Sequence, residues 1–116
     1  MILTTAHEGE SIEVGIVLAR ITKEVVCNNR PLPPSCAIIA SGETIVRIDN
    51  KYGQGAPNQA FALSAALQIT PYDKVAVAAI GTDGTDGPTD IAGGLTDSST
   101  ISRAQINNLD CIQTFA

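Results

Sequence analysis

An uninterrupted apolar run, Val75 to Ile80, is followed directly by ten residues, Gly81 to Asp90, that are all glycine, threonine or aspartate except for Pro88. A short run of small and β-branched residues is typical of a strand that is buried on both faces of a sheet. The polar segment would then leave the C-terminal end of a core strand, which is the edge where open α/β sheets bind ligands. These two segments predict an α/β fold with its functional site in the loop 81–90.

The rest of the chain supplies helices and further strands for the same layer. The predicted order is helix 11–28, strands 36–40 and 44–48, helix 57–70, strand 75–80, a short strand 92–96 and a last helix to about residue 107. Ser41-Gly42 is either a tight turn between two strands or a bulge inside one bent strand. Pro57 suits the first turn of a helix, and Ser98-Ser99 could cap the last one. We expect a single domain over residues 1–116, with a mixed, mainly parallel sheet packed by helices.

Composition excludes several classes of partner. Twelve acidic against seven basic residues give a formal net charge of −5, which would repel a polyanion. Aromatic residues make up 3% of the chain, too few for the stacking surfaces that bind single-stranded nucleic acid. No apolar run approaches the roughly 18 residues that span a bilayer, and the N-terminus lacks the pattern of a signal peptide. We therefore expect a cytoplasmic protein that binds neither nucleic acid nor membrane.

The cysteines indicate a reduced protein. Cys27, Cys36 and Cys111 have no Cys-x-x-Cys spacing, and His7 is the only histidine. Structural zinc needs more ligands than these. We expect three buried, reduced thiols.

Three carboxylates in the loop 81–90 are the first candidate site. Asp83, Asp86 and Asp90 are three and four residues apart, and oxygen ligands suit Mg²⁺ or Ca²⁺. Carboxylates this close repel one another unless a cation or hydrogen bonds compensate. The spacing does not fit an EF-hand. The alternative is that the Asp-Gly pairs only build turns and that Asp90 caps the element that follows.

Two further segments carry polar groups to strand and helix ends. Residues 53–59 are a glycine-bearing loop that opens into a helix, and free N–H groups there form a natural anion site. Asn58 and Gln59 add side-chain amides, although glycines before helices are common. Glu43 follows Ser41-Gly42 and could ligate a cation or accept a hydrogen bond from a hydroxyl. It could equally be a solvated turn carboxylate.

Together these segments resemble the C-terminal domain of the glycerate 2-kinase family, the MOFRL domain, nearly end to end. Residues 81–93 are similar to its signature Gly-Thr-Asp-Gly-x-Asp-Gly-Pro-Thr-Asp-x-Ala-Gly, and residues 53–59 to Gly-x-Gly-Gly-x-Asn-Gln. Residues 7–15 resemble Gly-Glu-Ala-x-Glu-Val-Gly, and residues 30–34 the stretch before Ser-Gly-Gly-Glu-Thr. The chain departs from the family at residues 40–45, which keep fewer glycines and threonines, and at Ala56 and Ala60.

The resemblance implies an ATP- and Mg²⁺-dependent kinase that phosphorylates D-glycerate at its 2-hydroxyl. By residue, it implies catalytic roles for Asp83, Asp86 and Asp90, with Mg²⁺ on Asp83 and Asp86; substrate contacts for Glu43, Thr82, Thr89, Asn58 and Gln59; and cofactor contacts for Gly53, Gly55, Ser41 and Gly42. Family members also carry a Rossmann-like N-terminal domain and a further C-terminal stretch with a Thr-Gly-Thr-Asn motif. Residues 1–116 would then be a partial chain that is inactive alone, and the face left exposed by the missing domain could drive self-association.

Two other functions stay open. A non-catalytic module could bind a cation or small anion, or dock onto a separate subunit. Hydroxypyruvate reductase, a name this family has sometimes carried, would need a nicotinamide site, and no Gly-x-Gly-x-x-Gly follows a strand here.

Overall fold

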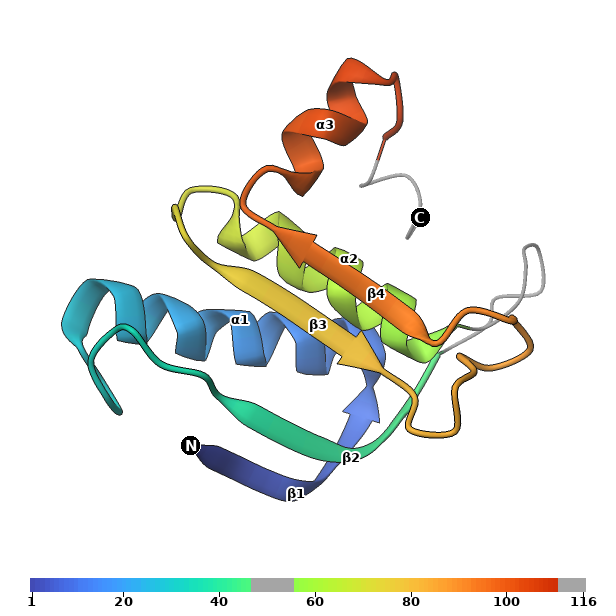
Figure 1. Ribbon diagram of the computed structural model, residues 1–116, viewed down its shortest axis with the longest axis horizontal. Coiled ribbons are helices and arrows are strands. Elements are labelled where there is room, and N and C mark those ends of the chain that lie inside the picture. The colour runs from blue at the N-terminus through green and yellow to red at the C-terminus, as the bar shows by residue number, and fades with distance from the viewer. Residues whose placement is uncertain (47–55, 111–116) are drawn as a thin grey trace.

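The computed structural model describes residues 1–46 and 56–110, and the α/β class is confirmed (Figure 1). The elements are β1 (Ile2–Glu10), α1 (Ser11–Asn28), β2 (Ile39–Ile45), α2 (Pro57–Ile69), β3 (Ala76–Ile80), β4 (Gly93–Asp97) and α3 (Thr100–Ile106). The expected helices α1 and α2 and the strands β3 and β4 form almost as the sequence predicts. Strand β1 was not predicted, because its second half, His7-Glu8-Gly9-Glu10, carries almost no apolar side chains.

The strands form two separate pairs. Strand β1 pairs with β2 in parallel, and β3 pairs with β4 antiparallel. Strand β2 continues through Ser41-Gly42, so the hairpin turn is wrong. These residues lie inside a single strand, as the alternative proposed, but the bulge expected there is absent. The irregularity lies in β1 instead, whose register against β2 shifts twice between Ile2 and His7.

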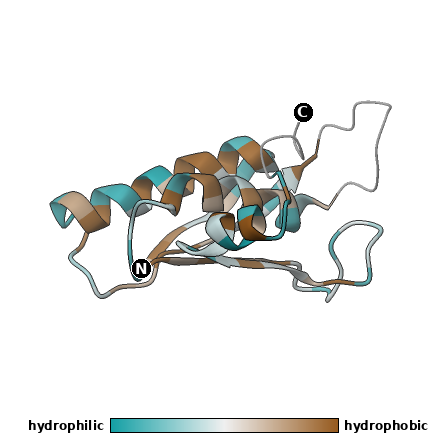
Figure 2. Cartoon of the chain, turned by 90° about the horizontal axis from the view of Figure 1, so that it is seen from above, coloured by the Kyte–Doolittle hydropathy of each residue, from teal (hydrophilic) through white to brown (hydrophobic). Residues whose placement is uncertain are grey.

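Helices α1 and α2 lie on the same side of the strands (Figure 2). Small residues bring the two helices close together, since a Cβ built on Gly15 would lie 2.2 Å from Ser64 Oγ. The core forms between α1, α2 and β3, and its buried apolar residues are Ala19, Ala65, Ile69 and Val75 in one cluster and Phe61, Ala62 and Ala79 in another. The alanine-rich face of α2 therefore sits at the centre of the packing.

Strand β3 was expected to be buried on both faces, and this is wrong within the described residues. Ala79 is buried against the helices, but Ala76 and Ala78 are exposed, and Ile80 is 67% exposed. Leu95 on the neighbouring β4 is 75% exposed. The helices cover only one face of the pair, so the strand alternates between a packed and an open side.

The expectation of buried cysteine thiols is also wrong for the two cysteines that the structure describes. Cys27 and Cys36 are exposed free thiols rather than buried ones, because they lie at the end of α1 and in the extended segment before β2. Cys111 lies outside the described residues. In the ranges 1–46 and 56–110, no helix is both long and apolar enough to cross a membrane.

The serine cap of α3 does not form either. Ser99 precedes the helix, but its side chain does not cap it. Instead, Asp97 Oδ1 accepts hydrogen bonds from Ser99 Oγ at 2.6 Å and from Ser99 N at 2.8 Å, and Asp97 N–H donates to Thr100 Oγ1 at 2.9 Å. The carboxylate at the end of β4 therefore holds Ser99 in the turn that precedes α3.

Candidate functional site

The C-terminal ends of β2 and β3 and the N-terminus of α2 lie on the same side of the molecule (Figure 1). The loop that follows β3 begins with a tight turn, in which Gly84 N–H donates to Gly81 O at 3.0 Å. A Cβ on Gly81 would lie 2.2 Å from Thr85 O. Glycine at position 81 is therefore needed for the loop to close on itself.

Asp86 ties this loop to α2. Its side chain is only 1% exposed. Oδ1 accepts from Asn58 N at 2.8 Å and from Asn58 Nδ2 at 3.1 Å, and Oδ2 accepts from Gln59 N at 2.8 Å. The first N–H groups of a helix have no partner inside it and carry partial positive charge. Ala56, at the cap position, has no side-chain acceptor, so Asp86 caps α2 from 28 residues away.

Thr89 adds a second connection between loop and helix. Its Oγ1 donates to Asp86 O at 2.8 Å and accepts from Gln59 Nε2 at 3.3 Å. The structure thus brings Asn58, Gln59 and Thr89 together, as a shared site requires. In this conformation Asn58 and Gln59 donate to Asp86, and Gln59 also donates to Thr89, which fixes the loop against the helix start.

The other loop groups face outward. Thr82, Asp83 and Asp90 are exposed, and Asp83 Oδ1 accepts from Thr85 N at 3.1 Å. This bond is the turn-building role that the alternative interpretation gave to an Asp-Gly pair. The loop therefore has a buried carboxylate on its inner side and two exposed carboxylates on its rim.

The fit to a divalent cation is limited in this arrangement. Within the part of the chain that the structure describes, no three His, Cys, Asp or Glu side chains gather closely enough to hold a metal ion. Both oxygens of Asp86 already accept N–H groups. A cation held by only one or two carboxylates, with phosphate oxygens completing its shell, is nevertheless the usual form of Mg²⁺ in kinases. The exposed Asp83 fits that form, and the metal roles of Asp83 and Asp86 stay predictions.

The third predicted segment, residues 41–44 in β2, is held in place by the first residue of α1. Ser11, fully buried at the start of α1, donates to Thr44 Oγ1 at 2.7 Å and lies 3.3 Å from Ile45 O. Ser41 and Glu43 are exposed in β2. A Cβ on Gly42 would lie 2.2 Å from His7 O, so the close approach of β1 already requires glycine there. Gly53 and Gly55 lie outside the described residues.

One acidic residue at this edge was not predicted. Glu8 of β1 lies opposite Glu43 of β2 in the parallel register, and both are exposed. Like charges at facing strand positions repel each other. The pairing could not be found from the sequence, because nothing in residues 2–10 predicts a strand or its neighbour.

The profile of the MOFRL family matches residues 36–116. The chain belongs to the MOFRL family. It is 41% identical over 109 residues to a glycerate 2-kinase of Pyrococcus horikoshii, covering 94% of this chain, and 46% identical over 99 residues to a D-glycerate 2-kinase of Thermotoga maritima, covering 85%. A crystal structure of a glycerate kinase (EC 2.7.1.31) from Thermotoga maritima superposes over 99% of the chain with a TM-score of 0.94 and 42% identity.

These relatives are much longer than residues 1–116. The chain spans 24% of the length of each of the two kinases and 28% of the crystallised chain. Residues 1–116 therefore correspond to about a quarter of those proteins.

Proposed function

We propose that residues 1–116 are the C-terminal part of an ATP-dependent glycerate 2-kinase of the cytoplasm, which transfers phosphate to the 2-hydroxyl of D-glycerate. The observation that carries this proposal is the group of hydrogen bonds that the Asp86 carboxylate accepts from the start of α2. It joins the loop 81–90 to Asn58 and Gln59, so that the two most distinctive family motifs form one surface. The kinase names of the relatives at 41% and 46% identity support the same activity.

Phosphoryl transfer needs positioning and neutralisation of charge more than covalent chemistry from the protein. We assign the chemical roles in the loop to Asp83 and Asp90, because their carboxylates are exposed to solvent and accessible to a substrate. Asp90 would accept the proton of the attacking hydroxyl, and Asp83 would help hold Mg²⁺, which would offset the negative charge of the ATP phosphates. Asp86 contributes by holding the loop in register with α2.

Neutral donors and hydroxyls would bind the substrate and the nucleotide. Thr82 and Thr89 on the loop, with the Asn58 and Gln59 amides, contact the glycerate carboxylate and hydroxyls. Glu43 accepts from a substrate hydroxyl at the end of β2. The backbone near Ser41, Gly42, Gly53 and Gly55 supplies N–H groups for phosphate oxygens.

The residues that face the loop 81–90 across the bound substrate would come from the rest of the longer polypeptide. We place the Rossmann-like N-terminal domain there, because the rim of the loop is open to solvent in residues 1–116. This predicts that the 116-residue chain alone does not turn over glycerate and ATP. A cation- or anion-binding module without activity is the competing function.

The direct test is an assay of the protein encoded by the complete reading frame with D-glycerate, ATP and Mg²⁺. Phosphorus NMR of the product distinguishes 2-phosphoglycerate from 3-phosphoglycerate. Asp83→Asn and Asp90→Asn should each lower kcat by roughly 100-fold, in the range found for a lost polar group in a transition state. Asp73→Asn, the same change at an exposed carboxylate at the opposite end of β3, is the matched control.

The outcomes separate the candidate functions. Full activity in both loop variants would remove the loop from the mechanism. Binding of Mg²⁺ or phosphate by calorimetry without phosphoryl transfer would favour the non-catalytic module. Reduction of hydroxypyruvate with NADH would replace the kinase by the reductase.

A further inference from the structure

One edge of β2 and one edge of β3 have no strand partner among the described residues, and these two edges face each other across a gap. Strand β2 pairs only with β1, and β3 pairs only with β4, among the described residues. The Cα atoms of β2 and β3 lie more than 8 Å apart along nearly their whole length. Paired strands are about 4.8 Å apart, so the separation is too wide for β2 and β3 to pair directly.

The backbone groups that face this gap on β3 follow from the ladder with β4. Gly81 N–H donates to Ala92 O at 2.7 Å. Backbone groups in a strand point alternately to its two sides, so Ala79 also bonds toward β4. The N–H and C=O groups of Ala76 and Ala78 therefore point to the opposite edge.

The same alternation applies to β2. Ile39 N–H donates to Met1 O at 2.9 Å, and the backbone groups of Ile38 and Ala40 therefore point away from β1. Strands β2 and β3 run in the same direction (Figure 1). A single inserted strand could thus be parallel to both or antiparallel to both.

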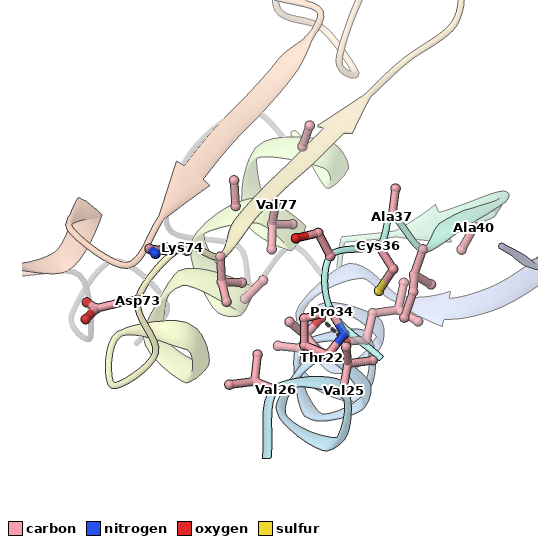
Figure 3. Close-up of a pocket in the computed structure, with 18 of the residues that line it drawn as sticks. Thr22, Val25, Val26, Pro34, Cys36, Ala37, Ala40, Asp73, Lys74 and Val77 are labelled. Atoms are coloured by element: carbon pink, nitrogen blue, oxygen red, sulfur yellow. Dashed lines mark hydrogen bonds between the residues drawn. The ribbon is translucent and has the colours of Figure 1, made fainter. Parts of the chain in front are cut away.

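A cleft of about 520 Å³ occupies the gap (Figure 3). Ile38 and Ala40 line one side, Ala76 and Ala78 the other, and α1 and α2 form an apolar floor that includes Leu18 and Phe61. Unpaired backbone groups on two sides and apolar side chains below are the surroundings of a central β-strand.

We propose that this cleft receives one β-strand, which joins the two pairs into a single five-stranded sheet. The occupant is a strand of the same longer polypeptide, from outside residues 1–116, with apolar side chains at every second position toward Leu18 and Phe61. The longer polypeptide has ample sequence for such a strand, because two relatives that match this chain in sequence and one that superposes on it each have about three quarters of their residues outside the matched part. Exposed edges of this kind otherwise invite aggregation.

Hydrogen exchange tests the proposal at single amides. The 116-residue chain is compared by NMR with the protein encoded by the complete reading frame. The amides of Ala76 and Ala78 should exchange at least about 100-fold more slowly in the longer protein, because they gain strand partners. The amide of Ala79, which bonds to β4 in both, is the internal control and should change little.

Alkylation gives a second measurement that needs no substitution. Cys36 lines the cleft and Cys27 does not, and both are exposed thiols. Iodoacetamide labelling, read by mass spectrometry of the two peptides, should be about tenfold slower at Cys36 in the longer protein and unchanged at Cys27.

Each other result overturns the proposal. Unprotected Ala76 and Ala78 amides, or a reading frame that adds no residues, would remove the inserted strand. Protection that grows with protein concentration would show a second copy at the edges. Shielding of Cys36 alone, with both edge amides still exchanging quickly, would show a small molecule in the cleft.

Discussion

The β3–β4 pair, with five residues in each strand, is shorter than the β1–β2 pair, with nine and seven residues, and the two pairs are held in different ways. Strands β3 and β4 lie against α2, whose face of Ala62, Ala65, Ala66 and Ile69 is almost completely buried. Strands β1 and β2 are largely exposed along their length and make few contacts with the helices. Side-chain packing therefore stabilises one half, whereas a backbone ladder and one buried hydroxyl hold the other.

The largest expected effect comes from the packed half. Ile69→Ala removes a side chain with no exposed surface, and the cavity should lower the free energy of unfolding by roughly 2–5 kcal/mol. Ile39→Ala on β2, where the side chain is 58% exposed, should cost less than about 0.5 kcal/mol in the same chain. Urea unfolding measures both. Equal losses would contradict the difference between the two halves.

The next effect comes from the connection between loop and helix. Asp86→Ala leaves the half-buried backbone N–H groups of Asn58 and Gln59 without their acceptor, which should cost about 1–3 kcal/mol. Asp83→Ala, at an exposed carboxylate of the same loop, is the control and should stay within about 0.5 kcal/mol. Thermal unfolding reports the difference. An Asp86→Ala variant with unchanged thermal stability would show that the loop does not depend on its hydrogen bonds to α2.

A smaller effect is expected where α1 meets the exposed half. Ser11→Ala removes the bond to Thr44 Oγ1 at 2.7 Å and should cost about 1 kcal/mol. Thr44→Ser keeps the hydroxyl and should retain most of the stability. Hydrogen exchange in β2 should rise in Ser11→Ala but not in β4. A uniform rise in both strands would mean that the two halves unfold as one unit.

The smallest effect is a pH dependence at the end of β4. The side-chain hydroxyl of Ser99, with its backbone N–H, holds the pKa of Asp97 below the usual value of 3.8. A lowered pKa stabilises the fold above the unfolded value and loses that contribution as the pH falls through the folded value. Asp97→Asn should therefore flatten the decline of Tm slightly below about pH 4. An unchanged decline would show that solvent screens the contact completely.

Local features that the sequence encodes directly were predicted well. The apolar spacing of residues 11–28, the Pro57 start of α2 and the apolar run before Gly81 each depend on neighbours in the chain. The candidate site was predicted as a set of segments, and Asp86 with Asn58 and Gln59 indeed lie together. The individual roles were not predictable, because Asp83 and Asp86 look alike in sequence yet one is exposed and the other buried.

The amino-acid sequence by itself determined the helices, the strand before the loop and the family motifs, since periodicity, prolines and glycines act within a few residues. Only the tertiary structure decided that Asp86 caps α2, that Glu8 faces Glu43, and that one side of β3 stays open. Each of these depends on groups distant in the chain meeting in space. Whether a carboxylate is buried or a strand face is covered depends on the segment that packs against it. The residues next to it in the sequence do not determine which segment that is.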